Sequence, residues 1–411
     1  MSLYRHLRTA ALAGFLTGAL PLVAPAQQQD MLDRMDRRLD GARDSLIAVR
    51  RNIHRHPELS GREERTAGVV AAYLEGLGFQ VRNGVGGHGV VGILRGSKPG
   101  PVVAFRADMD AVTSHAPDPV DFASVKPGVR HICGHDIHTT VGLGIAEAFA
   151  AVHDEVPGTV VLIFQPAEEN VQGAKAMIED GVLEDPAPQA IFAYHSAPLQ
   201  VGQVGSVEGL ALPGLDHFTA TFTGGRDPER AAGVFRSGIA DLNTPDDVPP
   251  ADFVRVMPRR TRQDSEGHWI VTGAVRAGSP EARSRVQAWM DGSMKGLEIA
   301  GEQGELEYQE FAVVPDMVND TALVRSTLDT FRSVLGAENL LEINQVTPQF
   351  SEDFARFQQH IPGAMYWLGV ANAELGYSGM PHSPDFVADE AAIGVGAMAM
   401  AAVMLNYLET H

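Results

Sequence analysis

Cysteine is the scarcest residue in this sequence, since its 411 residues include only Cys133. A single cysteine excludes an internal disulfide, so in an oxidising compartment the thiol would be buried, exposed to oxidation or held by a metal. Positive charge is also scarce, because 32 lysines and arginines face 52 acidic residues and leave a net charge of −20. Such a surface repels nucleic acid and anionic lipid, so neither is expected as a partner.

Long apolar runs are few. The first follows Arg5 and Arg8 and ends at a small-x-small cleavage site at residues 24–26. This pattern predicts a secretory signal over residues 1–26, and hence a secreted or periplasmic protein; a retained anchor is the alternative. Removal of the signal takes away two positive charges and changes the net charge from −20 to −22. The second run, residues 391–405, is rich in Ala and Gly and is expected to pack as a helix.

Length and pattern together predict an α/β protein with two domains. About 385 residues remain after the signal, which is more than one ordinary core accommodates. Helical and β-rich segments alternate between residues 44 and 194, as is typical of a sheet with helices on its faces. Chemistry gathers at the carboxyl ends of strands in such folds. Two predicted strands there lead into Glu168-Glu169 and into His195.

The segment PGVRHICGHDIHTT at residues 127–140 combines Cys133 with three histidines, His131, His135 and His138. Cys133 and His135 are two apart, so an extended or tightly turned backbone lets both side chains reach one point. A thiolate and an imidazole that meet there suit a borderline-soft divalent metal. The same pair could be a nucleophile and its base, or an inert thiol in a histidine-rich loop. Neither His131 nor His138 is expected to be a ligand.

Glu168 and Glu169 are adjacent carboxylates directly after a predicted strand. On an extended backbone they point to opposite sides, so one can bind a metal while its neighbour faces a water or the substrate. The alternative is an acidic pair at a helix start, where it would favour the helix dipole.

Several short motifs occur in an order that resembles one family of enzymes. They are RHPE at 55–58 with Glu64 and Thr66, RADMDA at 106–111, CGHD at 133–136, FQPAEE at 164–169, GAKAM at 173–177, His195, SEDF at 351–354, PGA at 362–364, and HSP at 382–384 with Phe386. Each motif alone is weak, but their joint order is specific. The sequence resembles the metal-dependent amidohydrolases that include hippurate hydrolase, N-acyl-amino-acid amidohydrolases and indole-acetyl-amino-acid hydrolases, a branch of the aminoacylase and carboxypeptidase G2-like metallopeptidases.

The resemblance implies an α/β fold, with a di-metal exopeptidase-like catalytic domain built on a central mixed sheet and an inserted, smaller α/β lid domain. The catalytic domain would comprise residues 27–211 and 314–411, and a shortened, divergent lid would comprise residues 212–313. The implied cofactors are two divalent ions, which manganese, zinc, cobalt or nickel would suit chemically. The implied ligands are Cys133, His135, Glu169, His195 and His382, with Cys133 as the bridge.

The resemblance also assigns roles around the metals. Glu168 would be the general base and acid that takes a proton from a metal-activated water and passes it to the leaving amine. Asp108 and Asp136 would orient the ligands. The predicted substrate is a small N-acyl amino acid or dipeptide-like molecule, and a homodimer is possible in this family.

The lid is where the resemblance weakens. Relatives carry Gly-Gly-His after the first lid strand, and that histidine steadies the oxyanion, commonly across a dimer. This sequence has Arg226 at the corresponding position. Arg226 could supply a permanent positive charge instead; the alternative is an exposed arginine in a lid loop. GAVR at 273–276 matches the lid strand whose arginine, here Arg276, is a candidate for the substrate carboxylate.

Three functions are compatible with these residues. The leading hypothesis is an exported metal-dependent amidohydrolase with Glu168 as its proton carrier. The second is a binding protein that keeps the metals but is catalytically weak or inactive, because the lid histidine is missing. The third is a thiol hydrolase that uses Cys133 and His135.

Overall fold

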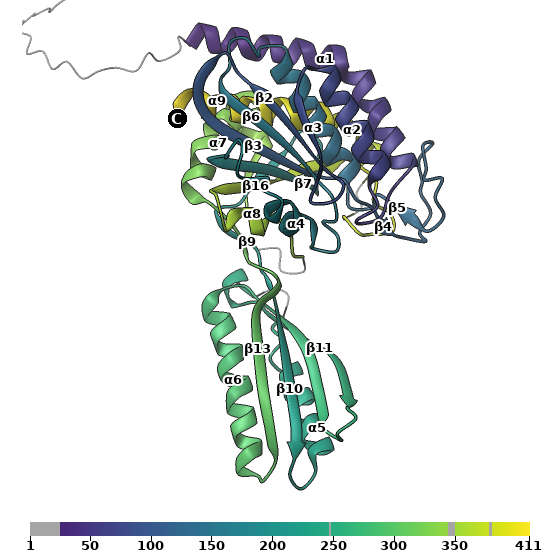
Figure 1. Ribbon diagram of the computed structural model, residues 1–411, viewed down its shortest axis with the longest axis vertical. Helices are drawn as coiled ribbons and strands as arrows, with labels where there is room; N and C mark the ends of the chain where they lie inside the picture. The colour runs from purple at the N-terminus through teal and green to yellow at the C-terminus, as the bar shows by residue number, and fades with distance from the viewer. Residues whose placement is uncertain (1–24, 246–247, 344–349, 378–379) are drawn as a thin grey trace, which may run out of the picture.

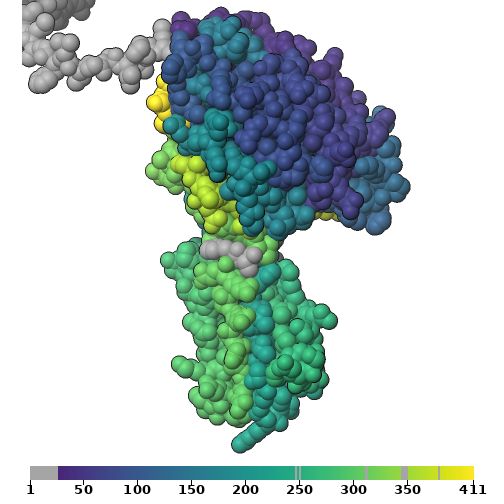
Figure 2. Space-filling view, in the orientation of Figure 1, coloured from purple at the N-terminus to yellow at the C-terminus, as the bar shows by residue number. Residues whose placement is uncertain are grey.

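The computed structural model describes residues 25–245, 248–343, 350–377 and 380–411 (Figure 1). These residues form a larger unit around an eight-stranded sheet and a smaller unit around a four-stranded sheet. A narrow connection joins the two units (Figure 2). The predicted signal lies outside the described residues, apart from residues 25 and 26, which begin the first helix.

The larger sheet is mixed. Its strands in spatial order are β1 (Gln80–Val85), β2 (Gly89–Arg95), β6 (Pro157–Gln165), β3 (Lys98–Asp108), β7 (Ala190–Gln200), β16 (Gly363–Ala371), β8 (Val204–Ser206) and β15 (Leu340–Glu342). Strand β3 runs parallel to both β6 and β7, and β7 runs parallel to β16. The carboxyl ends of these strands therefore meet at one edge of the sheet, where α/β proteins place their ligands. The predicted α/β class is confirmed.

Helices cover both faces of this sheet. One face packs against α1 (Pro25–Arg55), α2 (Glu64–Gly76), α3 (His135–Ala150), α7 (Thr321–Leu335) and α9 (Ala391–Thr410). The other face packs against α4 (Gly173–Glu179) and α8 (Ala355–Gln358). Helix α9 is the one described helix long and apolar enough to cross a membrane, but most of it is buried in the core. It packs against α1, α3 and α7, as predicted for the second apolar run.

Short elements complete the larger unit. Two small two-stranded sheets pair β4 (Val112–Thr113) with β5 (Val129–Arg130) and β9 (Gly209–Leu212) with β14 (Met317–Asn319). Single 3-10 turns occur at Ala337–Asn339 and Ala373–Leu375, and a third, Pro250–Asp252, belongs to the smaller unit.

Three element boundaries differ from the sequence-based expectation. Helix α1 is continuous from Pro25, because buried residues recur at helical spacing through its first half, at Met31, Met35, Leu39, Ala42 and Leu46. The sequence pattern predicts a helix from residue 139, but helix α3 begins at His135. Strand β7 continues past His195 to Gln200, because β16 pairs with it along this whole length. His195 therefore lies within a strand and not after it.

The smaller unit is a four-stranded antiparallel sheet in the order β11 (Val254–Gln263), β12 (Trp269–Ala277), β10 (Leu215–Gly224) and β13 (Gln303–Val314). Helices α5 (Pro228–Ala240) and α6 (Pro280–Ile299) share a core with it. Asp227 and Ser279 cap these helices by accepting backbone N–H bonds, and a proline follows each cap in the first turn. This is a favoured way to start a helix.

The chain enters and leaves the smaller unit at neighbouring points. Leu215, the first residue of β10, pairs in register with Val314, the last residue of β13. Beside this junction, Arg283 of α6 donates to Asp216 at 2.7 Å and to Asp316 at 2.8 Å. The junction is thus a two-stranded ribbon braced by a buried ion pair.

Candidate metal centre

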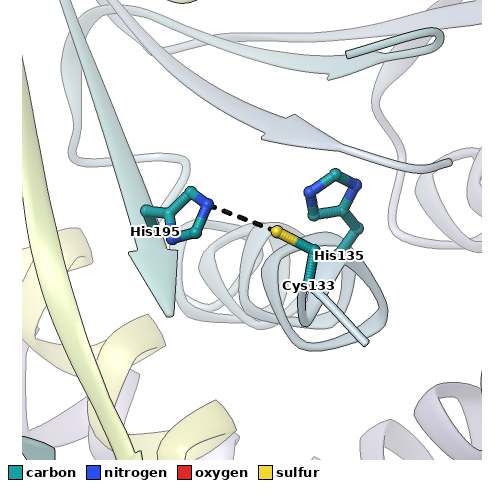
Figure 3. A group of neighbouring side chains, drawn as sticks. All are labelled: Cys133, His135 and His195. Carbon is teal, nitrogen blue, oxygen red and sulfur yellow. Dashed lines mark hydrogen bonds between the residues drawn. The ribbon is translucent and has the colours of Figure 1, made fainter. Parts of the chain in front are cut away.

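The loop before α3 brings Cys133 and His135 to one point. Gly134 between them has φ 93°, a left-handed conformation that glycine adopts readily. A Cβ on Gly134 would also lie 2.6 Å from the Ser196 hydroxyl oxygen, so this position requires glycine for space as well. Figure 3 shows Cys133 together with His135 from the start of α3 and His195 from β7. The Cys133 Sγ lies 3.5 Å from the His195 Nε2.

The five predicted ligands come together in two overlapping sets. In each set the potential ligand atoms lie within 4.8 Å of one another. The first set is Cys133, His135 and His195, and the second is Cys133, Glu169 and His382. Cys133 is common to both, which is the position that a ligand bridging two ions requires. The His382 Nε2 lies 3.3 Å from a Glu169 oxygen, so the C-terminal part of the chain closes the centre.

The histidine rings are oriented as metal ligands are. His195 donates from Nδ1 to the carbonyl of Ser196 at 2.8 Å, and His135 places Nδ1 3.2 Å from Asp110. Such contacts leave Nε2 of each ring with its lone pair directed into the centre. The Nε2 of His135 is buried without a hydrogen-bond partner among the described residues, and lies 3.8 Å from oxygens of Glu168 and Glu169. A lone pair that faces carboxylate oxygens fits a cation between them.

Charge in the centre is strongly negative. Burial disfavours the protonation of His135, but the charges of Asp108 and Cys133 outweigh it and raise the pKa of His135 well above its ordinary value. Hydrogen bonds to Cys133 and Glu169 raise the pKa of His382 to about 10. A centre that draws protons onto His135 and His382 at neutral pH has the field that divalent cations would neutralise.

Glu168 lies beside the donor sets, next to His135 and Glu169. It forms a buried group with Glu352 and Asp353, and one of its oxygens is 3.8 Å from the His135 Nε2. Burial raises the pKa of Glu168 well above its ordinary value, and the charges of Glu352 and Glu169 raise it further. A carboxyl with a raised pKa beside a metal centre can both take up and release a proton near neutral pH.

A fully buried arginine supports this side of the centre. Arg106 donates to Gln165 at 2.8 Å, to Asp108 at 2.6 Å, and to Glu352 and Asp353 at 2.9 and 3.2 Å. Held in this way, the other oxygen of Asp108 accepts from the His138 Nδ1 at 2.7 Å.

His138 uses both of its ring nitrogens inside the protein. While Nδ1 contacts Asp108, the Nε2 accepts the backbone N–H of Ser196 at 2.7 Å. Its ring therefore supports the residue after His195, and His138 is not free to bind a metal. His131 is buried with both ring nitrogens unpartnered among the described residues, 6.2 Å from the ring of His54. It belongs to neither of the two ligand sets.

Asp136 was expected to orient the metal ligands, but in the structure its side chain contacts other residues. Its carboxylate forms an ion pair with Arg50 at 2.7 Å and accepts a hydrogen bond from His54 at 2.8 Å, and none of its described side-chain contacts is a predicted ligand. Asp136 follows His135 on α3, and its side chain points toward α1. The carboxylate that contacts His135 is Asp110, which also accepts the backbone N–H of Glu169 at 3.0 Å. Its place in RADMDA, two residues after Asp108, was the available signal.

The thiol-nucleophile hypothesis is not favoured by this geometry. Cys133 is buried, and burial raises the pKa of its thiol. A nucleophilic cysteine needs a lowered pKa. The base expected for it, His135, is instead directed to Asp110 and to the two glutamates.

The two arginines predicted to contact substrate lie in the smaller unit. Arg276 of β12 is half-buried and faces Arg255 across the strand pair. Arg226 lies just after β10, is exposed, and is near Gly301. Figure 1 shows that β10 ends at the part of the smaller unit farthest from the larger one. Within one chain Arg226 therefore does not reach the centre, and its predicted role stays a prediction that requires a second copy.

Comparison with known proteins agrees with this geometry. The family model described as peptidase family M20/M25/M40 matches residues 104–406. The chain belongs to this peptidase family. The M20 match covers the candidate ligands and Glu168, and the chain is thus a metallopeptidase or metallo-amidohydrolase that acts on amide bonds.

Relatives and solved structures extend the similarity over nearly the whole chain. IAA-amino acid hydrolase ILR1-like 5 of Arabidopsis thaliana is 32% identical over 89% of this chain and 87% of its own length. N-acetylcysteine deacetylase of Bacillus subtilis is 32% identical over 89% of this chain and 97% of its own. The crystal structure of the Bacillus subtilis YXEP protein, a dinuclear metal binding peptidase from the M20 family, superposes with a TM-score of 0.79 at 30% identity, covering 90% and 99% of the two chains.

Proposed function

We propose that this M20-family enzyme is an exported amidohydrolase that cleaves an N-acyl amino acid, or a peptide-like amide next to a free carboxylate. The observation that carries the proposal is the pair of donor sets that share Cys133, with Glu168 buried beside them. The names of two relatives, an IAA-amino acid hydrolase and an N-acetylcysteine deacetylase, support this substrate class. The pattern of residues 1–26 supports a secreted or periplasmic location.

The donor set fits two divalent ions of borderline softness, such as manganese, zinc, cobalt or nickel. Cys133, His135 and His195 would hold one ion, and Cys133, Glu169 and His382 the other. When bound, the ions would supply Lewis acidity, which lowers the pKa of water and polarises the scissile carbonyl.

The chain's own residues perform the remaining steps. Glu168 accepts the proton of the attacking water and delivers it to the amide nitrogen, so that a C–O bond forms, the C–N bond breaks and a free amine leaves. Asp110 and the Ser196 carbonyl fix the rings of His135 and His195. The smaller unit acts as a lid that brings Arg276 to the substrate carboxylate, a contact that arginine makes with two parallel hydrogen bonds.

The test is the Glu168→Gln variant of the metal-loaded protein. Gln keeps the shape of the side chain but cannot carry the proton, so hydrolysis of a panel of N-acyl amino acids should fall by about 10²–10⁴-fold. Metal content, measured by mass spectrometry, should stay at up to two ions per chain. Hydrolysis of each compound is measured by the amount of free amino acid released.

A matched control is Glu229→Gln, which removes an exposed carboxylate in the first turn of α5. It should leave turnover unchanged. Metal-loaded wild-type protein that hydrolyses no member of the panel, and that Glu168→Gln does not alter, would contradict the proposal. That result would favour the alternative function, a binding protein that holds the metals but does not catalyse hydrolysis.

A further inference from the structure

A cavity of about 280 Å³ opens directly beside the metal centre. The donor residues Cys133, Glu169, His195 and His382 form one end of its wall. The rest is mostly apolar and includes Leu199, Leu212, Ile343, Phe350, Trp367 and Met380. A space of this size and lining, next to the reacting atoms, accommodates an apolar part of the substrate.

Two aromatic rings connect the apolar wall to the donors. The indole of Trp367 meets the ring of His195 edge-on, with centroids 5.8 Å apart. The ring of Phe350 lies 6.5 Å from the ring of His382. Trp367 is also the register partner of His195 across β16 and β7, so both side chains project from the same face of the sheet. A group bound against Trp367 is therefore next to the candidate ligands.

Charge decides which part of the substrate fits there. The described residues that line the cavity include no lysine or arginine, whereas Glu168, Glu169 and Glu352 all border it. Beyond the donor residues, the described lining therefore offers a substrate carboxylate no cationic side chain. The carboxylate end must therefore leave the centre in another direction, and the group that enters the cavity comes from the acyl side of the scissile bond.

Backbone pairing fixes the inner end of the cavity. The Ile343 N–H donates to the carbonyl of Ser206 at 2.7 Å, which holds Ile343 against β8. Neighbouring Gly205 has no side chain, and side chains that line the cavity occupy the space where its Cβ would be. A Cβ there would lie 2.7 Å from the Ile343 Cδ1, 3.1 Å from the Trp367 Cβ and 3.2 Å from the Leu199 Cδ1. The three side chains that line the cavity thus rest directly on this glycine.

We propose that the cavity is an acyl-selecting pocket that takes a medium-length alkyl or an aryl acyl group, with Ile343 as a specificity-determining residue and Gly205 as the glycine that sets its depth. This inference rests on the proposed function, because it assigns one end of the same substrate. It predicts that the enzyme prefers N-hexanoyl and N-benzoyl amino acids to N-acetyl amino acids.

The first experiment measures binding, so that it does not depend on turnover. Glu168→Gln protein loaded with zinc or manganese is titrated calorimetrically with N-acetylglycine, N-hexanoylglycine and N-benzoylglycine. Each buried methylene contributes roughly a factor of four to affinity, so the hexanoyl compound should bind at least about tenfold more tightly than the acetyl compound.

Two further variants in the Glu168→Gln background locate the pocket. Ile343→Trp fills the cavity from its inner end, so the ratio of hexanoyl to acetyl affinity should fall close to one. Gly205→Ala pushes Ile343 and Leu199 into the same space from behind, so the ratio should fall by a smaller factor. The matched control is Val234→Trp on α5, where 52% of the valine is exposed and a larger side chain faces solvent. That control should keep the full ratio.

The outcomes separate this inference from the proposed function. Equal affinity for the acetyl and hexanoyl compounds, or a preference that survives Ile343→Trp, would overturn the pocket. A preference that follows the amino-acid side chain, tested with N-acetylleucine against N-acetylglycine, and that Ile343→Trp abolishes would also overturn it, because the cavity would then hold the other end of the substrate. Wild-type protein that shows the acyl preference in binding but hydrolyses nothing would overturn only the proposed function.

Discussion

Two buried arginines, one in each unit, make similar ion pairs with different consequences. Arg106 is fully buried in the larger unit and binds Asp108, Glu352 and Asp353. Arg283 is 5% exposed at the junction of the smaller unit and binds Asp216 and Asp316. The two networks have the same residue types. They differ in the further contacts that the partner carboxylates make.

The carboxylates of the first network extend into the chemistry. Asp108 holds His138, and Glu352 borders Glu168. The carboxylates of the second network extend into the scaffold, since Asp316 accepts the backbone N–H of Gly214 at 2.7 Å. A buried ion pair is weak evidence for function by itself, and only its onward contacts show whether it serves the centre or the joint.

Of the three arginine replacements, that of Arg106 should have the largest effect on stability and activity. Arg106→Met leaves three carboxylates buried without their counter-charge, which should lower the free energy of unfolding by about 3–5 kcal/mol. Activity should also fall, because Glu168 would lose its ordered neighbour Glu352. Urea unfolding and metal content measure the two effects. A variant that keeps both its stability and its activity would show that Arg106 is only a filler of the core.

The pH dependence of the same variant gives a second check. Burial opposes ionisation of Asp108, but His135 and Arg106 outweigh it and hold the pKa of Asp108 well below its ordinary value. A carboxyl with a lowered pKa stabilises the fold above its unfolded pKa of about 4, and the stabilisation is lost as the pH falls further. The difference between wild type and Arg106→Met should thus be largest near neutral pH and shrink below about pH 4.

Replacement of Arg283 should have a smaller and different effect. Arg283→Met removes the brace at the junction and should cost about 2 kcal/mol, since Asp316 is partly exposed and can recover water. Metal content should not change, because none of the Arg283 ion-pair partners reaches the donor sets. Calorimetry and metal analysis measure the two quantities, and a loss of bound metal would show that the joint and the centre are coupled.

Replacement of Arg226 should have the smallest effect. Arg226→Ala changes an exposed side chain, so the free energy of unfolding should stay within about 0.5 kcal/mol and kcat/KM within about twofold. A fall of about 10²–10³-fold would instead identify Arg226 as an oxyanion donor to the centre of a second copy. Measurement at several protein concentrations distinguishes a contribution from a partner.

The sequence was informative where chemistry depends on short spacing. Cys133 and His135 were predicted to meet because they are two apart on an extended or tightly turned segment, and the left-handed Gly134 between them achieves this. His382 was predicted only through the family resemblance, because no local pattern ties it to residues far upstream. Asp136 was predicted to orient the ligands and no role was predicted for Asp110, because only packing shows that Asp110 faces His135 and Asp136 faces Arg50.

Other features had no sequence signal. The end of β7 was placed before His195 because the alternation of residue types does not reveal that β16 continues to pair beyond it. The apolar cavity combines side chains from β7, β16 and the segment after β15, which meet only in the folded sheet. The positions of Arg226 and Arg276 depend on the direction of strands in the smaller unit, which composition does not specify.

The pairing of Leu215 with Val314 has a consequence for how the protein can vary. Because the hundred or so residues between them begin and end side by side, the larger sheet would keep its connectivity if this stretch were exchanged for another of the same width at its base. The stretch could therefore be exchanged as a unit without disturbing the donors of the metal centre. Arg226, the predicted departure from the family pattern, lies in this stretch, whereas every candidate ligand lies outside it.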